Sequence, residues 1–415
     1  GLVEIFADWD VTKDEASAAV AAGVAEDSAY RADISAAGRE AMEYMARTGT
    51  RGVVLAGRPY HVDPEVNHGI PELVNGLGLV VLTESAVLGL GELERPLRVR
   101  DQWAYHSRLY QAAAAVAQQP NLQLVQLTSF GCGLDAVASD QTAEILAGTG
   151  DVYTALKIDE VSNLGAARIR LRSLDAAVRE RARHTSAGGS GDAGSAVRSR
   201  GHALARVPFT ERMKAEHTVI APQLSPVHFR LLESAFRAEG YRLQVQEHVA
   251  TGDVETGLTF VNNDACYPAI IVIGQLVNAL RAGRYDPDKT TLLITQTGGM
   301  CRATNYTSLL RRALHDAGYG QVPVLAISIP MLEENPGFRI TRRLVHRGLQ
   351  ALVLGDLLQS LLLRVRPYEA VPGLASALYE RWDAIIRAHL LRPGISTRSI
   401  RDTVQGRPAR VPGGY

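Results

Sequence analysis

Cysteine is scarce in this sequence, which has 415 residues and three cysteines, at positions 132, 266 and 301. So few cysteines, so widely separated, exclude the disulfide framework of a small secreted protein. Their spacing also lacks a CxxC or any other short metal-ligand pattern. Free thiols persist in a reducing compartment, so we expect a cytoplasmic protein.

An excess of charge of either sign is also missing, because 44 basic side chains balance 44 acidic ones. This balance predicts neither a nucleic-acid partner nor an anionic membrane partner. Residues 1–20 carry acidic side chains between Asp8 and Glu15 where a signal peptide has an apolar core. The most apolar stretch, 349–365, is short and contains polar side chains, so it predicts a buried helix and not a membrane span.

Nucleotide-binding signatures are absent as well. The sequence has no Walker A motif, and Gly76-Leu77-Gly78 lacks the third glycine of a dinucleotide-binding fingerprint. The chain is therefore not expected to hydrolyse ATP by itself. It begins at Gly1 without a methionine, and we expect it to be a segment of something longer.

Short apolar runs without polar alternation recur along the chain, separated by helical patterns. Such runs are typical of parallel sheets that are buried on both faces. We predict an α/β fold with two units, each a mainly parallel sheet flanked by helices. The predicted strands are 52–56, 79–82, 122–127 and 153–158 in the first half, and 218–221, 241–245, 258–261, 291–295 and 322–328 in the second.

Changes in composition divide the chain into five segments. An Ala-, Glu- and Arg-rich lead-in predicts two helices broken near Gly23 and Ser35, and a Gly/Ser-rich stretch too small and polar to pack predicts a flexible linker. The tail has scattered Gly and Pro and is expected to be loosely held. The segments are the helical lead-in 1–48, the first α/β unit 49–184, the linker 185–206, the second α/β unit with carboxy-terminal helices 207–392, and the tail 393–415.

Each cysteine is expected where a strand gives way to a helix. Thr128 and Thr297 each stand four residues before a cysteine, with glycine between. A thiol at a helix N-terminus faces free N–H groups and the positive end of the helix dipole, which favours the thiolate that binds iron or zinc and attacks electrophiles. The alternative is that each cysteine is a small buried hydrophobe.

The most unusual polar stretch, Gly57–Gly69, follows the first predicted strand. Tyr60 and His61 are candidates for donating hydrogen bonds to a ligand or relaying protons. Alternatively, His61 and His68 bind a metal with the carboxylates between them, or the stretch only builds a long turn. Arg302, directly after the last cysteine, either binds an anionic group or is a surface arginine.

Six sequence blocks carry a family resemblance. The blocks are Gly57-Arg58-Pro59-Tyr60-His61, Asn67-His68-Gly69-Ile70-Pro71-Glu72-Leu73, Ser129-Phe130-Gly131-Cys132-Gly133, Lys157-Ile158-Asp159-Glu160, Asn262-Asn263-Asp264-Ala265-Cys266-Tyr267-Pro268 and the run 295–306 around Cys301. From about Ala36 to Glu369 the chain resembles the carboxy-terminal part of the large acyl-CoA dehydratase activase-related proteins. These are relatives of 2-hydroxyacyl-CoA dehydratase subunits and of double-cubane cluster proteins.

The resemblance implies iron–sulfur chemistry. In the related dehydratase subunits three cysteines bind each 4Fe–4S cubane, one iron stays open to substrate, and an ATP-driven activator donates a low-potential electron. A larger double-cubane cluster and a homo-oligomer are also consistent with the resemblance. Long members of the family begin with ATPase modules and a further cysteine-containing domain, and neither is found in this sequence, so the resemblance implies that some cysteines of the full assembly lie on such a part.

The first hypothesis is an iron–sulfur enzyme, or a component of one, that acts reductively on a CoA thioester or small molecule. Cys132, Cys266 and Cys301 would be the ligands and their sulfurs should converge, while Tyr60, His61 and Arg302 would contact the substrate or support the cluster. The second hypothesis is a cluster-free module that binds an acyl-CoA or a partner protein. A structural zinc site is the third.

Overall fold

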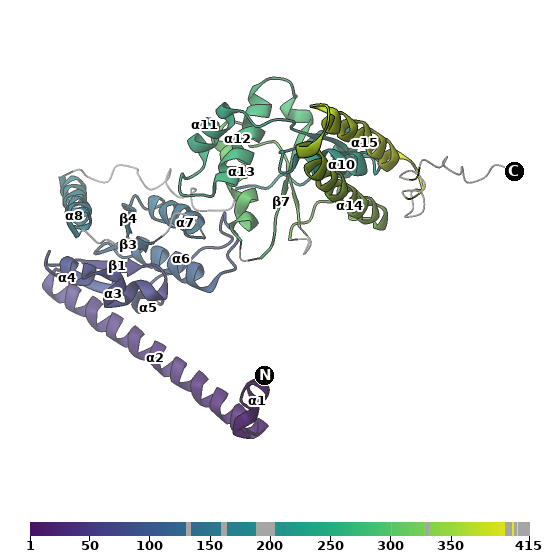
Figure 1. The fold of residues 1–415 in the computed structure, drawn as a ribbon. Helices are drawn as coiled ribbons and strands as arrows, with labels where there is room; N and C mark the ends of the chain where they lie inside the picture. The colour runs from purple at the N-terminus through teal and green to yellow at the C-terminus, as the bar shows by residue number, and fades with distance from the viewer. Residues whose placement is uncertain are drawn as a thin grey trace. The chain divides into compact units, whose positions relative to one another are not determined.

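A computed structural model describes residues 1–129, 134–158, 164–187, 204–299, 301–328 and 332–394, together with residues 401 and 405. The chain divides into two compact units, Gly1–Ala203 and Leu204–Tyr415. Each unit contains a four-stranded parallel sheet flanked by helices, so the predicted α/β class is confirmed (Figure 1).

The sheet of the first unit has the strand order β2-β1-β3-β4. All neighbours are parallel; Val53, for example, lies opposite Val81 on one side and Gln123 on the other. The two central strands, β1 and β3, are buried along their whole length, which explains why most of their residues are apolar. The strands are β1 (Gly52–Ala56), β2 (Val80–Thr83), β3 (Leu122–Thr128) and β4 (Thr154–Lys157), close to the predicted ranges.

Helices cover both faces of this sheet. Val54 and Leu124 face one side, where they pack with α6 (Ala104–Ala117), α7 (Asp135–Ala147) and Met45. Alternate residues of the same strands face the other side, with α4 (Ile70–Asn75) and α8 (Leu164–Ala187). The shorter helices are α3 (Pro64–Asn67) and α5 (Glu84–Val87).

The lead-in forms one helix of 36 residues, α2 (Lys13–Thr48), preceded by the short α1 (Leu2–Ile5). The predicted break near Gly23 and Ser35 is therefore wrong. A glycine inside a helix costs only about 1 kcal/mol relative to alanine, which is too little to end a long helix. Thr12 caps the helix by accepting the N–H of Glu15, and Gly49 ends it in the left-handed conformation at φ 68°.

The second unit repeats this topology, with the strand order β6-β5-β7-β8 and parallel neighbours throughout. In both sheets the chain adds one strand beside the first and then crosses to its other side. The direction of winding therefore reverses between the first and third strands of each unit. The strands are β5 (Thr218–Ala221), β6 (Arg242–Val245), β7 (Thr290–Thr295) and β8 (Val324–Ile327).

Two helical layers also cover the second sheet. Ile220 and Leu292 face α12 (Tyr267–Arg281) and α13 (Tyr306–Asp316). Val219 and Leu293 face the other layer, which includes Phe338 and Leu344. The helices α10 (Pro226–Arg237), α14 (Arg342–Val365) and α15 (Leu374–Leu391) pack together around their own apolar cluster (Figure 1). The short α9 (Glu211–Glu216) precedes β5.

The predicted strand at 258–261 is wrong, because these residues continue and end α11 (Thr251–Phe260). A four-residue apolar run does not distinguish a strand from a buried helix segment. Asp253 favours the helix by accepting the N–H of Ala250 at 2.8 Å. Gly257 allows α12 to approach closely, since a Cβ there would lie 2.1 Å from the carbonyl oxygen of Ile270.

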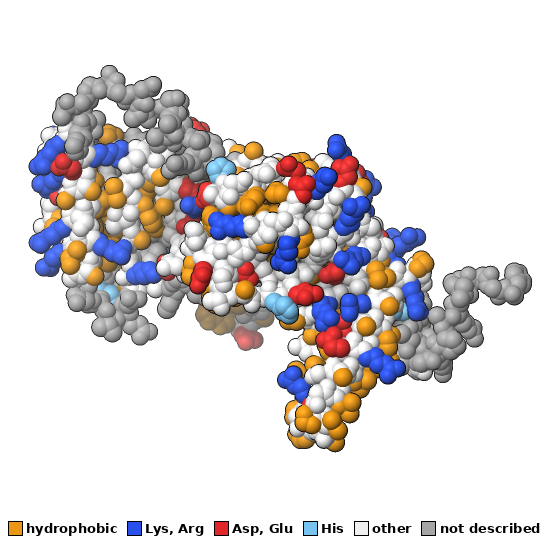
Figure 2. Space-filling view, turned by 90° about the horizontal axis from the view of Figure 1, so that it is seen from above, with side chains coloured by type: hydrophobic (Ala, Val, Ile, Leu, Met, Phe, Trp, Pro, Cys, Tyr) orange, Lys and Arg blue, Asp and Glu red, His pale blue; other side chains and the backbone are white. Residues whose placement is uncertain are grey.

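The predicted buried helix near the carboxyl end is buried on one face only. In α14, Leu354 and Leu358 are buried, whereas Leu349, Val353 and Leu361 are at least half exposed. Hydrophobic side chains gather over the end of the α14–α15 hairpin (Figure 2). Within the described residues, the helical run Arg342–Tyr368 is long and apolar enough to cross a membrane by length and composition, and 28% of its most apolar window is buried.

The linker and the tail fall mostly outside the described residues. Helix α8 continues to Ala187, so the first residues of the predicted linker are helical. Residues 188–203 are not described, and the flexibility of the linker stays a prediction. Of the predicted tail, residues 393, 394, 401 and 405 are described.

Candidate functional site

Those functional residues predicted from the sequence that the structure describes lie toward the carboxyl ends of the two sheets. Open parallel sheets bind ligands at this edge, at the point where the direction of winding reverses. In the first unit that point lies between the loops after β1 and β3, and in the second between the loops after β5 and β7. We describe each unit separately.

Cys266 is the N-cap residue of α12 and is buried, with 7% of its surface exposed. It follows helix α11 and not a strand, which corrects the prediction. Its sulfur lies 2.6 Å from the hydroxyl of Tyr306, the first residue of α13. Because α12 leads into the amino end of β7 and α13 follows β7, both residues lie toward the carboxyl edge of the sheet.

The surroundings of Cys266 favour its thiolate. Burial opposes ionisation, but the Tyr306 hydroxyl, the Arg302 guanidinium and the backbone N–H of Ala269 outweigh it, so the pKa of Cys266 is lowered. Burial and the neighbouring sulfurs of Cys266 and Cys301 raise the pKa of Tyr306. Tyr306 therefore stays protonated, and its hydroxyl donates a hydrogen bond to the sulfur of Cys266.

Cys301 lies in the loop after β7, where it is the N-cap of the short 3₁₀ helix Arg302–Asn305. It is exposed, and its sulfur accepts the N–H of Ala303 at 3.5 Å. Thr304 shapes the loop by donating to the carbonyl oxygen of Gly299 at 3.0 Å. These contacts fix the backbone on both sides of Cys301 while its sulfur stays accessible.

In the first unit, the His61 side chain packs against the turn after β1 and is 1% exposed. Its Nδ1 accepts the backbone N–H of Arg58 at 3.0 Å, so the ring proton is on Nε2. Among the described residues, this buried Nε2 has no hydrogen-bond partner. Burial and the charge of Arg58 lower the pKa of His61 despite the opposing charge of Asp135, so the ring is neutral near pH 7.

Two carboxylates accompany His61. Glu84, at the carboxyl end of β2, accepts the N–H of Gly57 at 2.9 Å, and burial raises its pKa despite that bond and the nearby Arg108 and His106. Asp135 opens α7 and accepts from Arg58 at 3.2 Å.

His106 lies 3.4 Å from the same oxygen of Asp135. Burial alone would raise the pKa of Asp135, but the hydrogen bonds from His106 and Arg58 lower it, so it is an anion. The first unit thus pairs one carboxyl group that resists ionisation with one that favours it.

Tyr60 links the two loops of the first unit. Its hydroxyl lies 3.3 Å from the hydroxyl of Ser129, the residue after β3, and its ring contacts His61 edge to face. Ser129 stands three residues before Cys132 in the sequence. Cys132 itself lies outside the described residues, so the predicted convergence of the three sulfurs stays a prediction.

Sequence reasoning overlooked several residues of these clusters. Tyr306 was part of a recognised block but had no assigned role, and Glu84 and Asp135 were not singled out. Their sequence positions could have identified them, because residues that follow strands lie at the ligand-binding edge of a parallel sheet. Glu84 directly follows β2, and Asp135 comes soon after β3. The alternative of a metal bound by His61 and His68 has no support in the described residues, where no group of three or more His, Cys, Asp or Glu side chains could bind a metal.

The repeated topology relates the cysteines to one another. Cys132 follows the third strand of the first unit in the sequence, as Cys301 follows the third strand of the second. The N-cap position of the helix before the third strand holds Trp103 in the first unit and Cys266 in the second. The second unit therefore contains two of the three thiols.

Comparison with known proteins gives one match. Residues 1–87 match the family model described as the CoA enzyme activase uncharacterised domain. This segment includes α2, β1, β2 and the Gly57–Gly69 stretch, and it associates the chain with CoA enzyme activase systems. No curated protein and no solved structure matches the chain.

Proposed function

We propose that the chain is an iron–sulfur protein of the 2-hydroxyacyl-CoA dehydratase type. It would receive low-potential electrons from an ATP-dependent activator and carry out reductive chemistry on a CoA thioester or a small molecule. The family match supports the association with a CoA activase system. The observation that carries the proposal is the thiolate-favouring environment of Cys266, beside Arg302 and Tyr306.

The donor set fits a cluster in part. Iron–sulfur clusters take thiolates as ligands, and hydrogen bonds to the sulfurs tune their potential. Cys266 and Cys301 would supply two sulfurs from the second unit, and Cys132 is the candidate for the third. When bound, a 4Fe–4S cluster would supply one-electron reduction and an open iron for the substrate.

The chain's own residues have distinct tasks in this proposal. The Tyr306 hydroxyl stabilises the Cys266 thiolate, and Arg302 compensates its charge. In the first unit, the buried Nε2–H of His61 would donate a hydrogen bond to a substrate oxygen once the covering loop opens, and the Glu84 carboxyl group is suited to proton transfer. These roles are proposals for the two described clusters, each within its own unit.

The decisive experiment is iron and acid-labile sulfide analysis after oxygen-free purification and reconstitution. The wild-type chain should be brown, and Cys266→Ser and Cys301→Ser should each abolish the charge-transfer absorption, because a hydroxyl rarely replaces a thiolate ligand. Tyr306→Phe is the matched variant. It should retain iron and sulfide but shift the midpoint potential to a lower value, since it loses one hydrogen bond to a ligand sulfur.

A wild-type chain that stays colourless and binds no iron would overturn the proposal. Zinc bound by the same cysteines would indicate the structural alternative. Binding of an acyl-CoA without any metal would instead support a cluster-free binding module.

A further inference from the structure

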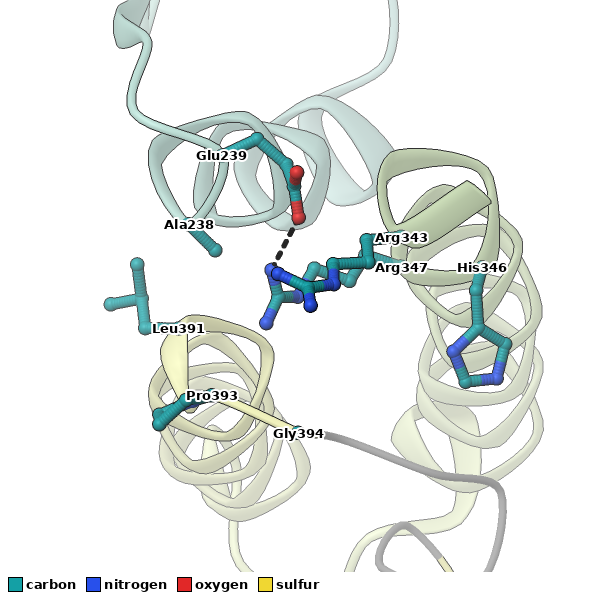
Figure 3. A pocket seen from close by; sticks show the side chains of 8 residues that line it. All are labelled: Ala238, Glu239, Arg343, His346, Arg347, Leu391, Pro393 and Gly394. Carbon is teal, nitrogen blue, oxygen red and sulfur yellow. Dashed lines mark hydrogen bonds and ion pairs between the residues drawn. The ribbon is translucent and has the colours of Figure 1, made fainter. Parts of the chain in front are cut away.

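A cavity in the second unit lies away from both cysteines. It has a volume of about 560 Å³ and is bounded by the end of α10, the first turns of α14 and the end of α15 (Figure 3). Helix α10 starts after the carboxyl end of β5 and ends shortly before the amino end of β6. The cavity is therefore near the amino edge of the sheet, opposite the edge where Cys266 and Cys301 lie.

Glu239 is the acidic residue of the cavity, and both of its carboxylate oxygens already have partners. Arg347 donates to Oε1 at 2.7 Å, and the hydroxyl of Thr341 donates to Oε2 at 3.1 Å. Arg347 uses its other terminal nitrogen to bind the carbonyl oxygen of Arg392 at 2.8 Å. Among the described residues, Arg347 is the ion-pair partner of Glu239.

Two arginines of the cavity wall, Arg343 and Arg347, still have positive charge or hydrogen-bond donors that the described residues do not use. Arg347 is 6% exposed, and its Nε has no hydrogen-bond partner among the described residues. Arg343 forms no ion pair within the described part of the chain. Figure 3 shows Arg343 and Arg347 extending from α14 toward Glu239, whereas His346 lies on another side of the helix.

We propose that this cavity binds a small organic anion through a phosphate or carboxylate group. Arg343 would form the ion pair, because the planar guanidinium matches two oxygens of such a group, and the Nε–H of Arg347 would add a buried donor. The volume exceeds that of inorganic phosphate, and Ala238, Leu391 and Pro393 provide an apolar wall for the carbon part of the ligand. The site is independent of the proposed iron–sulfur function.

The test is calorimetric titration of the full chain with inorganic phosphate and, separately, with citrate, at constant ionic strength. The two titrants distinguish phosphate from carboxylate recognition. Arg343→Gln should weaken binding about tenfold, the effect of losing a charge-assisted hydrogen bond. Arg343→Lys should weaken it less, because it keeps the charge but loses the planar fork.

Arg342→Gln is the matched control, because Arg342 is the exposed neighbour of Arg343 on the same helix and does not line the cavity. It should leave binding within about twofold of the wild type if the effect is local. Failure of both anions to bind would overturn the proposal. So would an equal loss in Arg342→Gln and Arg343→Gln, because it would show general electrostatic attraction. Neither outcome depends on the iron content of the protein.

Discussion

Two titratable side chains fix the turn after β1 by accepting hydrogen bonds from the backbone N–H groups of two successive residues. Glu84 accepts the N–H of Gly57 and His61 accepts the N–H of Arg58. A side chain at position 57 would not fit, since its Cβ would lie 2.5 Å from Nδ1 of His61. The conformation of this loop is therefore linked to the protonation of His61, whose acceptor nitrogen is lost when the ring becomes cationic.

The stability of the protein should reflect this linkage. Because the pKa of His61 is lowered on folding, the unfolded chain binds the proton more readily, and the free energy of unfolding should fall as pH drops below about 6.5. His61→Asn keeps an acceptor for Arg58 but does not titrate. It should reduce the slope of stability against pH by up to about 1.4 kcal/mol per pH unit, as measured by urea unfolding.

His68→Asn is the control for this prediction. His68 has a positive φ of 55°, which asparagine tolerates, so the substitution removes a nearby histidine and should leave the free energy of unfolding at neutral pH nearly unchanged. The linkage would be refuted if His61→Asn kept the wild-type slope, because the other buried histidines with a lowered pKa, His217 and His389, would then account for it.

At the scale of elements, the crossing of α11 and α12 positions Cys266. Two glycines make the close contact possible. A Cβ at Gly274 would lie 1.7 Å from the carbonyl oxygen of Asp253, and one at Gly257 would lie 2.1 Å from that of Ile270. Because backbone atoms have little room to move, any side chain at either position must separate the helices and displace the N-terminus of α12.

Gly274→Ala should therefore destabilise the protein by about 3 kcal/mol, the upper part of the range for overpacking. Gly252→Ala is the matched change in α11, where a Cβ would meet nothing within 4 Å. It should be neutral or stabilise by up to about 1 kcal/mol, because alanine favours the helix. Thermal unfolding of the two variants tests the pair, and equal midpoints would contradict the proposed contact.

Local pattern predicted most elements, because the central strands are short, apolar and buried on both faces. Prediction from local pattern failed where the same hydrophobic pattern is compatible with two different structures. The run 258–261 fits a strand or a helix equally well, and the helix is favoured by the N-terminal cap from Asp253 and by the contact of Gly257 with α12. The run 349–365 was read as buried because apolar content does not show that Leu354 packs while Val353 faces outward.

The candidate site was predictable residue by residue but not as clusters. The pattern around Tyr60 and His61 identified them, yet the partners Glu84 and Asp135 are far along the chain and meet the turn only through the strand order. Tyr306 reaches Cys266 across 40 positions for the same reason. Contacts of this kind depend on topology, which periodicity does not specify.

At the scale of the whole molecule, every described strand pair and every described apolar cluster lies within one unit. We therefore expect residues 1–187 and 204–394, expressed as separate chains, each to fold cooperatively, as measured by circular dichroism during urea unfolding. A cut between Val249 and Ala250 is the control. It separates β5 and β6 from β7 and should leave the second unit unfolded. If the cut between the units also gave unfolded pieces, the units would depend on each other for stability.

The repeated strand order has a consequence for biosynthesis. In each sheet the first strand lies in the middle, the second joins one side, the third joins the other, and the fourth joins the third. As the ribosome releases the chain, each new strand meets a free edge of a sheet that is already present, and no strand has to be inserted between two paired neighbours. The chain is therefore suited to vectorial folding, in which the first sheet is complete before the second begins to emerge.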